Sequence, residues 1–202
     1  MSSVAGKFRQ LDNWFGSDMK FHRLYPTPIR QLARRHWTPI SIAKLAAGFL
    51  VPDNGVRVLD IGSGVGKFCL CAAHYKPFAS FYGIEQRKEL VEHAETAKSI
   101  LGLDNVTFAH GNFTQLDLSK YDHFYFYNSF FENLDSTDKI DDTIFYSESL
   151  YDYYNRYLYK QLEGMPAGTR VATCCSLDDE IPPDYQLINS SDDRFLKFWM
   201  KI

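Results

Sequence analysis

The stretch VLDIGSGVGKF, residues 58–68, decides the fold of this 202-residue chain. Its apolar start reaches a carboxylate at Asp60, and glycines then follow at the alternate positions Gly62, Gly64 and Gly66. Such a run indicates a buried parallel strand, a tight turn and the first turn of a helix. Glycine lets a backbone adopt positive φ and approach a ligand closely, and free amides at a helix start attract polar or anionic groups. The stretch therefore predicts a nucleotide-type cofactor site.

Strand and helix patterns alternate after this stretch. The strand patterns fall at residues 56–61, 80–84, 105–109, 121–127 and 169–174, and a C-terminal hairpin at 185–189 and 195–202. The helical patterns fall at residues 67–75, 87–101 and 144–162. This alternation predicts an α/β fold in which helices flank a doubly wound, mostly parallel sheet of seven strands with an antiparallel C-terminal hairpin.

The N-terminal quarter differs from the rest in charge. Residues 1–50 hold eight basic and two acidic residues, a net charge of +6, which leaves about −9 for the remainder of a chain with net charge −3. We expect these residues to form a helical lead-in or lid over a core at 51–202, so that 1–202 is a single domain. The basic lead-in suits an anionic partner, although a solvated helix face is the simpler explanation. The acidic loop at 134–143 suits a cationic acceptor instead.

Composition also limits the compartment and the partners. A whole-chain charge of −3 gives no general case for nucleic-acid binding, so nucleic acid is an unlikely partner. The four cysteines, Cys69, Cys71, Cys174 and Cys175, lack the spacing of a zinc or redox motif, so we expect buried free thiols and no metal. No signal-peptide pattern and no apolar run of about 18 residues occurs, so we expect a cytoplasmic protein without a membrane span.

Two residues favour one cofactor over another, and a third fits both. A dinucleotide fingerprint requires a third glycine where this chain has Lys67. Asp60 precedes the first glycine by two residues, where it suits the amino-acid end of S-adenosylmethionine and would sit awkwardly beside a pyrophosphate. Glu85 ends the second strand, and an acid there binds ribose hydroxyls in both classes of protein. The pattern thus favours S-adenosylmethionine, and an NAD-dependent oxidoreductase is the disfavoured reading.

Residues 56–133 resemble the core of the class I S-adenosylmethionine-dependent methyltransferases. The resemblance rests on VLDIGSGVGKF, on the second-strand signature FYGIEQRKELVEHAE, on NVTFAHGNFTQLDL and on a fourth strand that runs into FYFYNSFFENL. It implies that Asp60 helps to hold the methionine amino group, that Glu85 accepts both ribose hydroxyls and that Gln86 lies beside the adenine. Asn112 would accept the adenine amine in place of the usual acid, and Phe113 would pack on the ring. The implied turn under the methionine and ribose consists of Gly62, Ser63, Gly64 and Gly66.

The end of the fourth strand faces the reactive methyl group in this family. Methyltransferases that act on planar nitrogens often carry Asn-Pro-Pro-Tyr there; this chain keeps Asn128 and an aromatic ring at Phe131, but Ser129 and Phe130 replace the prolines. The segment also resembles, over a few residues, the disruptor-of-telomeric-silencing family of lysine methyltransferases. We therefore predict Asn128, Phe131 and Glu132 as catalytic residues. Alternatively, Phe130 and Phe131 only seal the cofactor pocket.

The sequence thus predicts a methyltransferase that acts on a nitrogen of an unidentified acceptor, a protein or a small molecule, with a protein lysine as one option. Methyl transfer from a sulfonium needs positioning and charge arrangement more than a nucleophilic side chain, so the absence of an evident His or Cys nucleophile does not weigh against activity. The alternative is a cofactor-binding scaffold that has this fold and no catalysis.

Overall fold

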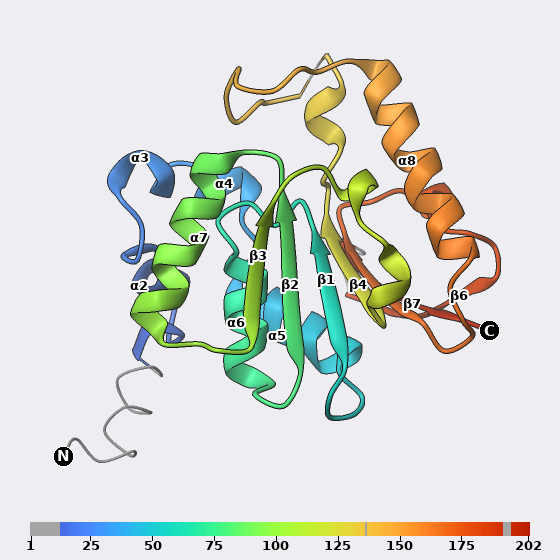
Figure 1. The fold of residues 1–202 in the computed structure, drawn as a ribbon, viewed down its shortest axis with the longest axis horizontal. Coiled ribbons are helices and arrows are strands. Elements are labelled where there is room, and N and C mark those ends of the chain that lie inside the picture. Colours follow the sequence, from blue (N-terminus) through green and yellow to red (C-terminus); the bar gives the residue numbers. More distant parts are fainter. Residues whose placement is uncertain (1–12, 136, 192–194) are drawn as a thin grey trace.

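A computed structural model describes residues 13–135, 137–191 and 195–202. Within these residues one sheet of seven strands has the order β3-β2-β1-β4-β5-β7-β6 (Figure 1). Strands β1 to β5 run parallel, and β7 is antiparallel to both β5 and β6. The strands are β1 (Arg57–Ile61), β2 (Ser80–Glu85), β3 (Val106–His110), β4 (His123–Tyr127), β5 (Arg170–Cys174), β6 (Tyr185–Ser190) and β7 (Leu196–Lys201). The predicted fold class is confirmed.

Helices cover both faces of the sheet (Figure 1). On one face lie α5 (Ile40–Leu50), α6 (Lys67–Tyr75) and α7 (Lys88–Leu101), together with the short helices α2 (Asp18–His22), α3 (Thr27–Arg30) and α4 (Ala33–His36). On the other face lie α8 (Glu148–Glu163) and the 3₁₀ turns η1 (Phe113–Gln115) and η2 (Leu118–Lys120). Two further 3₁₀ turns, η3 (Phe131–Asn133) and η4 (Asp178–Glu180), follow β4 and β5.

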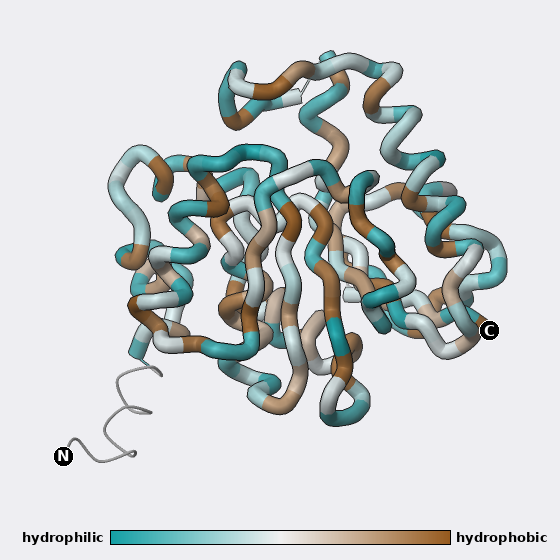
Figure 2. Tube along the Cα trace, in the orientation of Figure 1, coloured by the Kyte–Doolittle hydropathy of each residue, from teal (hydrophilic) through white to brown (hydrophobic). Residues whose placement is uncertain are grey.

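Two hydrophobic cores follow from the alternation of side chains along each strand. In β4, Tyr125 packs in the core under α5 and α6, whereas Phe124 and Phe126 pack in the core under α8. A strand buried on both faces reads as a continuous apolar run, which is why β4 is so aromatic. Figure 2 shows the same pattern as hydrophobic stretches in the central strands.

The lead-in packs against the turn that follows β1. The Tyr25 hydroxyl donates a hydrogen bond to the Val65 carbonyl over 3.0 Å, and the buried Lys67 ammonium pairs with Asp18. The Asp18 carboxylate also accepts the Ile40 amide over 3.1 Å, which satisfies one free donor at the start of α5. Residues 1–12 of the predicted lead-in lie outside the described residues.

One predicted helix begins later than the pattern indicates. The apolar residues Ile144, Phe145 and Tyr146 suggest a helix from 144, but α8 starts at Glu148. Ser147 is its N-cap, and its side chain accepts the Leu150 amide. Residues 137–146 instead form a loop beside the carboxyl ends of the strands, which gives this loop access to the site.

Two smaller expectations concern thiols and membranes. Within the described residues the four cysteines form no disulfide bond; Cys69, Cys71 and Cys174 are buried, while Cys175 is only half-buried. Among the described residues, no helix combines the length and the apolar character that crossing a membrane requires.

Candidate active site

The three glycines of residues 58–68 meet different structural requirements. All have positive φ, at 76° for Gly62, 53° for Gly64 and 79° for Gly66. A Cβ on Gly62 would lie 2.9 Å from Ser129 Cβ, and a Cβ on Gly66 would lie 2.3 Å from the Phe108 ring. A Cβ on Gly64 would meet nothing within 4 Å. Gly62 and Gly66 therefore permit close packing of the turn, whereas Gly64 borders open space.

That open space is a cavity of about 370 Å³ at the carboxyl ends of β1, β2 and β4. Open parallel sheets bind ligands in this position. Asp60 and Ser63 line an adjoining cavity of about 30 Å³, while Gly66 and Asn112 line neither cavity. The residues predicted for the site that line the larger cavity are Gly62, Gly64, Glu85, Gln86, Phe113, Asn128, Phe131 and Glu132.

Glu85 is the last residue of β2, and its carboxylate is held by two backbone amides. It accepts the Gly64 amide over 3.1 Å and the Arg87 amide over 2.8 Å. Burial raises the pKa of Glu85, against the opposing effect of these donors and of the Arg87 guanidinium. Each oxygen of a carboxylate accepts about two hydrogen bonds, so acceptor capacity remains for two hydroxyl groups of a ribose.

Asp60 lies deeper than the other predicted cofactor residues. Burial raises its pKa to about 8, although the Cys69 thiol donates to it over 3.6 Å. A ligand ammonium group beside Asp60 would favour its ionised form, because the positive charge would compensate that of the buried carboxylate. Ser63 packs over β2, where a Cβ on Gly83 would approach its Oγ to 2.6 Å. The Ser63 side chain thus lies against the sheet, and only its backbone belongs to the turn.

The side of the site assigned to adenine divides into two parts. Gln86 and Phe113 line the cavity, and the Phe113 ring stacks on Phe130 with centroids 5.1 Å apart. Asn112 instead caps η1: its Oδ1 accepts the Thr114 amide, and its amide group donates to the Tyr154 hydroxyl over 2.8 Å. The structure therefore commits Asn112 to internal hydrogen bonds.

Asn128 has an unusual backbone and an unsatisfied side chain. Its φ is 51°, in the left-handed region that few residues other than glycine adopt. Its Oδ1 is buried and has no hydrogen-bond partner among the described residues, and Asn128 is one of the residues that line the cavity. Strain and an unsatisfied acceptor at one residue are typical of functional sites. Beside it, burial raises the pKa of Tyr127 to about 12, so that this hydroxyl stays neutral.

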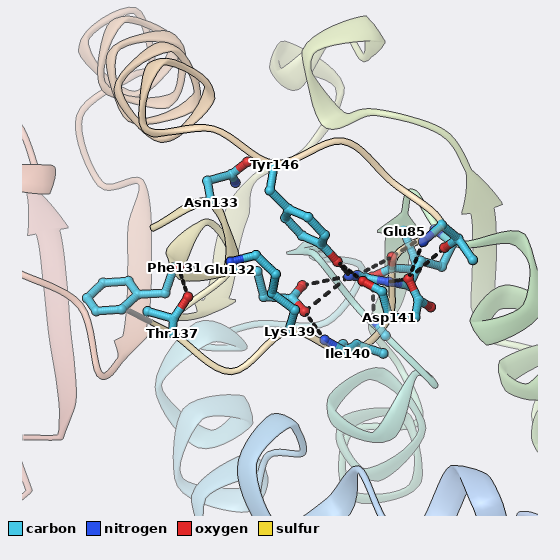
Figure 3. A network of polar contacts seen from close by, with 12 residues as sticks. Glu85, Phe131, Glu132, Asn133, Thr137, Lys139, Ile140, Asp141 and Tyr146 are labelled. Atoms are coloured by element: carbon cyan, nitrogen blue, oxygen red, sulfur yellow. Dashed lines mark hydrogen bonds and ion pairs between the residues drawn. The ribbon is translucent and has the colours of Figure 1, made fainter. Parts of the chain in front are cut away.

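Glu132 and Phe131 take different directions from η3 (Figure 3). The Glu132 carboxylate accepts the Arg87 guanidinium over 3.0 Å and the Ile140 amide over 2.6 Å. The Phe131 ring points away from that network in Figure 3 and meets the Tyr151 ring edge-on at 5.9 Å. Glu132 is therefore engaged in holding the loop that follows it.

Sequence reasoning missed Arg87, which joins the cofactor side of the cavity to the loop. Its guanidinium lies 3.7 Å from Glu85, donates to Asp141 over 3.1 Å and also donates to Tyr146. Figure 3 shows Tyr146 and Asp141 converging toward Glu85. The sequence does contain a signal for this contact: a basic residue directly follows Glu85-Gln86, and the later loop at 134–143 is acidic. His36 and Trp37, from the lead-in, also line the cavity and were not predicted.

Comparison with known proteins identifies the family. A family model described as a methyltransferase domain matches residues 52–157, just over half of the chain. A tRNA (guanine-N(7)-)-methyltransferase of Synechococcus sp. (strain JA-3-3Ab) is 50% identical over 54 residues, which are 27% of this chain and 23% of that protein. A 23S rRNA (uracil(1939)-C(5))-methyltransferase RlmD of Shewanella sp. (strain MR-7) is 39% identical over 74 residues, 37% of this chain and 16% of that protein. These alignments span less than a quarter of either relative.

Solved structures share the fold at low sequence identity. TrmN from Thermus thermophilus superposes with a TM-score of 0.60 and 20% identity, over 86% of this chain and 52% of that chain. An RNA methyltransferase from Salinibacter ruber in complex with S-adenosyl-L-homocysteine superposes with a TM-score of 0.57 and 20% identity, over 82% and 92% of the two chains.

One expectation from the sequence is wrong. Nucleic acid was taken as an unlikely partner because the net charge is −3, yet the curated relatives are named as tRNA and rRNA methyltransferases. The net charge of the whole chain averages a basic lead-in with an acidic core and so conceals the local field that a partner meets. The expectations of family and cofactor are confirmed: the chain belongs to the methyltransferase domain family, as a class I member that uses S-adenosylmethionine.

Proposed function

We propose that this S-adenosylmethionine-dependent methyltransferase transfers its methyl group to a nitrogen of an RNA base. The observation that carries the proposal is the position of Asn128, which lines the cavity and whose Oδ1 has no hydrogen-bond partner within the described residues. An amide oxygen of this kind accepts an N–H from the edge of a planar base. The aromatic rings of Tyr127, Phe130 and Phe131 line the same cavity and offer surfaces on which a base stacks.

The ion pairs of the loop carboxylates weaken the case for a cationic acceptor. A protein lysine was suggested by the acidic loop at 134–143, but Asp141 is paired with Arg87 and Asp138 with Arg35. Arg35 and His36 of α4 line the cavity. The names of the two relatives described above, a tRNA and an rRNA methyltransferase, support an RNA acceptor.

Residues of this chain would bind and orient the reactants. When bound, S-adenosylmethionine supplies an electrophilic methyl group: the nitrogen lone pair forms the new N–C bond while the C–S bond breaks and its electron pair stays on sulfur. Asn128 would fix the base edge, and Glu85 and Asp60 would hold the polar groups of the cofactor. A ring nitrogen with a free lone pair has no proton to lose, while an amino nitrogen passes its proton to water. In this mechanism the protein contributes mainly by positioning the base and the cofactor.

A tritium-transfer assay tests the proposal. The protein is incubated with methyl-tritiated S-adenosylmethionine and either total cellular RNA or a ribonuclease-treated cell extract. We expect tritium in a ribonuclease-sensitive fraction and a rate about five- to a hundredfold lower for Asn128→Gly, because a lost hydrogen bond to a buried group costs about 1–3 kcal/mol. Glycine tolerates the left-handed backbone of residue 128, so the variant removes the side chain without adding strain.

Two outcomes would overturn the proposal. Tritium in the ribonuclease-resistant protein fraction would establish a protein acceptor. Tight binding of S-adenosylhomocysteine without transfer to either fraction would establish the scaffold that the sequence left open. That residues 1–202 form a single methyltransferase domain, with 1–50 as its lid, also remains part of this proposal.

A further inference from the structure

A second groove, of about 690 Å³, adjoins the cofactor cavity. It runs between α3–α4 of the lead-in and residues 138–140 of the loop after η3. The groove and the cavity share five lining residues, so they form one continuous depression in the surface. The shared residues are Leu32, Arg35, His36, Asp138 and Ile140.

The lining of this groove is basic. Arg34, Arg35 and Lys139 contribute permanent positive charges, and Asp138 contributes the one carboxylate among the described lining residues. Arg34 is exposed and makes no ion pair within the described part of the chain. Lys139 is also exposed; its ammonium donates to the Leu134 carbonyl and lies 5.1 Å from the centre of the Tyr146 ring. The groove therefore has cationic groups from two separate segments.

Within the described residues, the ion pair between Arg35 and Asp138 spans the groove. Arg35 and Asp138 approach to 2.6 Å, and their side chains are 66% and 64% exposed. An exposed pair of this kind contributes about 0–1 kcal/mol, so an incoming anion can replace Asp138 at little cost. Arginine binds phosphate oxygens through its planar, forked set of donors.

We propose that this groove binds backbone phosphates of the RNA acceptor next to the nucleotide that enters the cavity. The proposal rests on the proposed function, because the two depressions are continuous and a bound polynucleotide would occupy both. A phosphate displaces Asp138 from Arg35, and Arg34 and Lys139 bind from opposite walls. The sequence assigned no partner to the basic lead-in. In this proposal its partner is the anionic RNA backbone.

The test compares two double variants in RNA binding. Arg34→Gln with Lys139→Gln removes two groove cations that do not line the cofactor cavity. Arg156→Gln with Lys160→Gln removes a matched, exposed pair from α8, away from both depressions. Fluorescence anisotropy with a labelled single-stranded RNA should give an affinity at least about tenfold weaker for the groove variant and within about twofold of wild type for the control.

Salt dependence and a third variant sharpen the test. Because each phosphate contact to a single strand contributes about −0.7 to the slope of log affinity against log salt, the groove variant should lose about 1.4 from that slope. Asp138→Asn should bind the RNA more tightly than wild type, because it removes the competing carboxylate. Equal RNA affinities for the groove variant and wild type, or weaker binding by Asp138→Asn, would overturn the assignment of the groove.

Two further measurements distinguish a failure of the groove assignment from a failure of the proposed function. Calorimetric binding of S-adenosylhomocysteine should be the same for the groove variant and wild type, which also shows that the variant is folded. In methyl transfer to RNA, the groove variant should raise KM much more than it lowers kcat. If wild type methylates RNA and the groove variant does so with an unchanged KM, only the groove assignment fails. If wild type does not methylate RNA at all, the proposed function itself fails.

Discussion

Glu85 and Gln86 are neighbours in the chain, but their side chains have different surroundings. Glu85 is buried and held by two backbone amides, while Gln86 accepts a single hydrogen bond from Asn112 over 3.3 Å. Replacing a buried charged acceptor costs about 1.5–3 kcal/mol. We therefore expect Glu85→Gln to weaken calorimetric binding of S-adenosylhomocysteine at least about tenfold, and Gln86→Ala to weaken it by less than about threefold. Equal losses for the two variants would contradict the ribose role of Glu85.

Asp60 makes the stability of the unliganded protein depend on pH. Its pKa rises from 3.8 to about 8 on folding, because burial disfavours the charge. Between these values the folded state keeps a proton that the unfolded state releases, so this contribution is fully present below about pH 4 and is lost as the pH rises to about 8. The free energy of unfolding in urea, measured at pH 5 and pH 8, should therefore fall less with pH for Asp60→Asn than for wild type. The exposed variant Asp104→Asn should behave as wild type does; an Asp60→Asn profile parallel to that of wild type would rule out a buried neutral carboxyl.

The sequence predicts single residues best where one local rule determines them. Glycines at 62, 64 and 66 follow from the turn, and all three have positive φ. Asn112 was harder to predict, because its hydrogen bonds depend on Tyr154, a residue 42 positions later. The left-handed backbone of Asn128 has no sequence signal, since most asparagines at the end of a strand have negative φ.

At the scale of elements, the loop of residues 137–146 depends on contacts that join distant segments. Arg87 donates to Asp141 over 3.1 Å, and Glu132 accepts the Ile140 amide. We expect Asp141→Asn to speed amide hydrogen exchange in residues 138–146 by about three- to tenfold, since a partly buried ion pair is lost, with no change in β1 or β2. The adjacent exposed variant Asp142→Asn is the matched control. Unchanged exchange in Asp141→Asn would show that Arg87 does not hold the loop.

The same loop shows why some elements escape prediction. Its apolar residues at 144–146 fit a helical pattern, and only the cap at Ser147 separates them from α8. Ile144 and Tyr146 line the cavity, whereas Phe145 is exposed. A hydrophobic pattern does not record which of these surroundings a residue has.

For the whole molecule, an ion pair between a buried lysine and a half-exposed aspartate joins the lead-in to the core. Asp18 pairs with Lys67, whose side chain is only 4% exposed, and it also accepts the Ile40 amide. Removing Asp18 leaves the buried Lys67 ammonium without this carboxylate, which is destabilising. We expect Asp18→Asn to speed tryptic cleavage at Arg23, Arg30 and Arg34 several-fold, by mass spectrometry of the fragments. The exposed control Asp53→Asn should be cleaved at the wild-type rate. Equal cleavage rates for the two variants would show that the pair of Asp18 and Lys67 does not hold the lead-in on the core.

The overall architecture was more predictable than the acceptor. Parallel strands, crossover helices and the C-terminal hairpin each leave a periodic pattern in the sequence, and the sheet order agrees with it. The acceptor class depends on which charges face the cavity. Asp138 and Asp141 read as a free acidic loop in the sequence, but in three dimensions both pair with arginines. Net charge could not reveal that pairing.

The most direct measurement is mass spectrometry of nucleosides from RNA that has been incubated with the protein and S-adenosylmethionine carrying a trideuterated methyl group. Fragmentation separates each base from its ribose and so locates the label. The account predicts a trideuterated methyl group on a base nitrogen, formed by wild type and strongly reduced in Asn128→Gly. Label confined to the ribose or to protein, or no label in an RNA-bound and cofactor-bound enzyme, would contradict it.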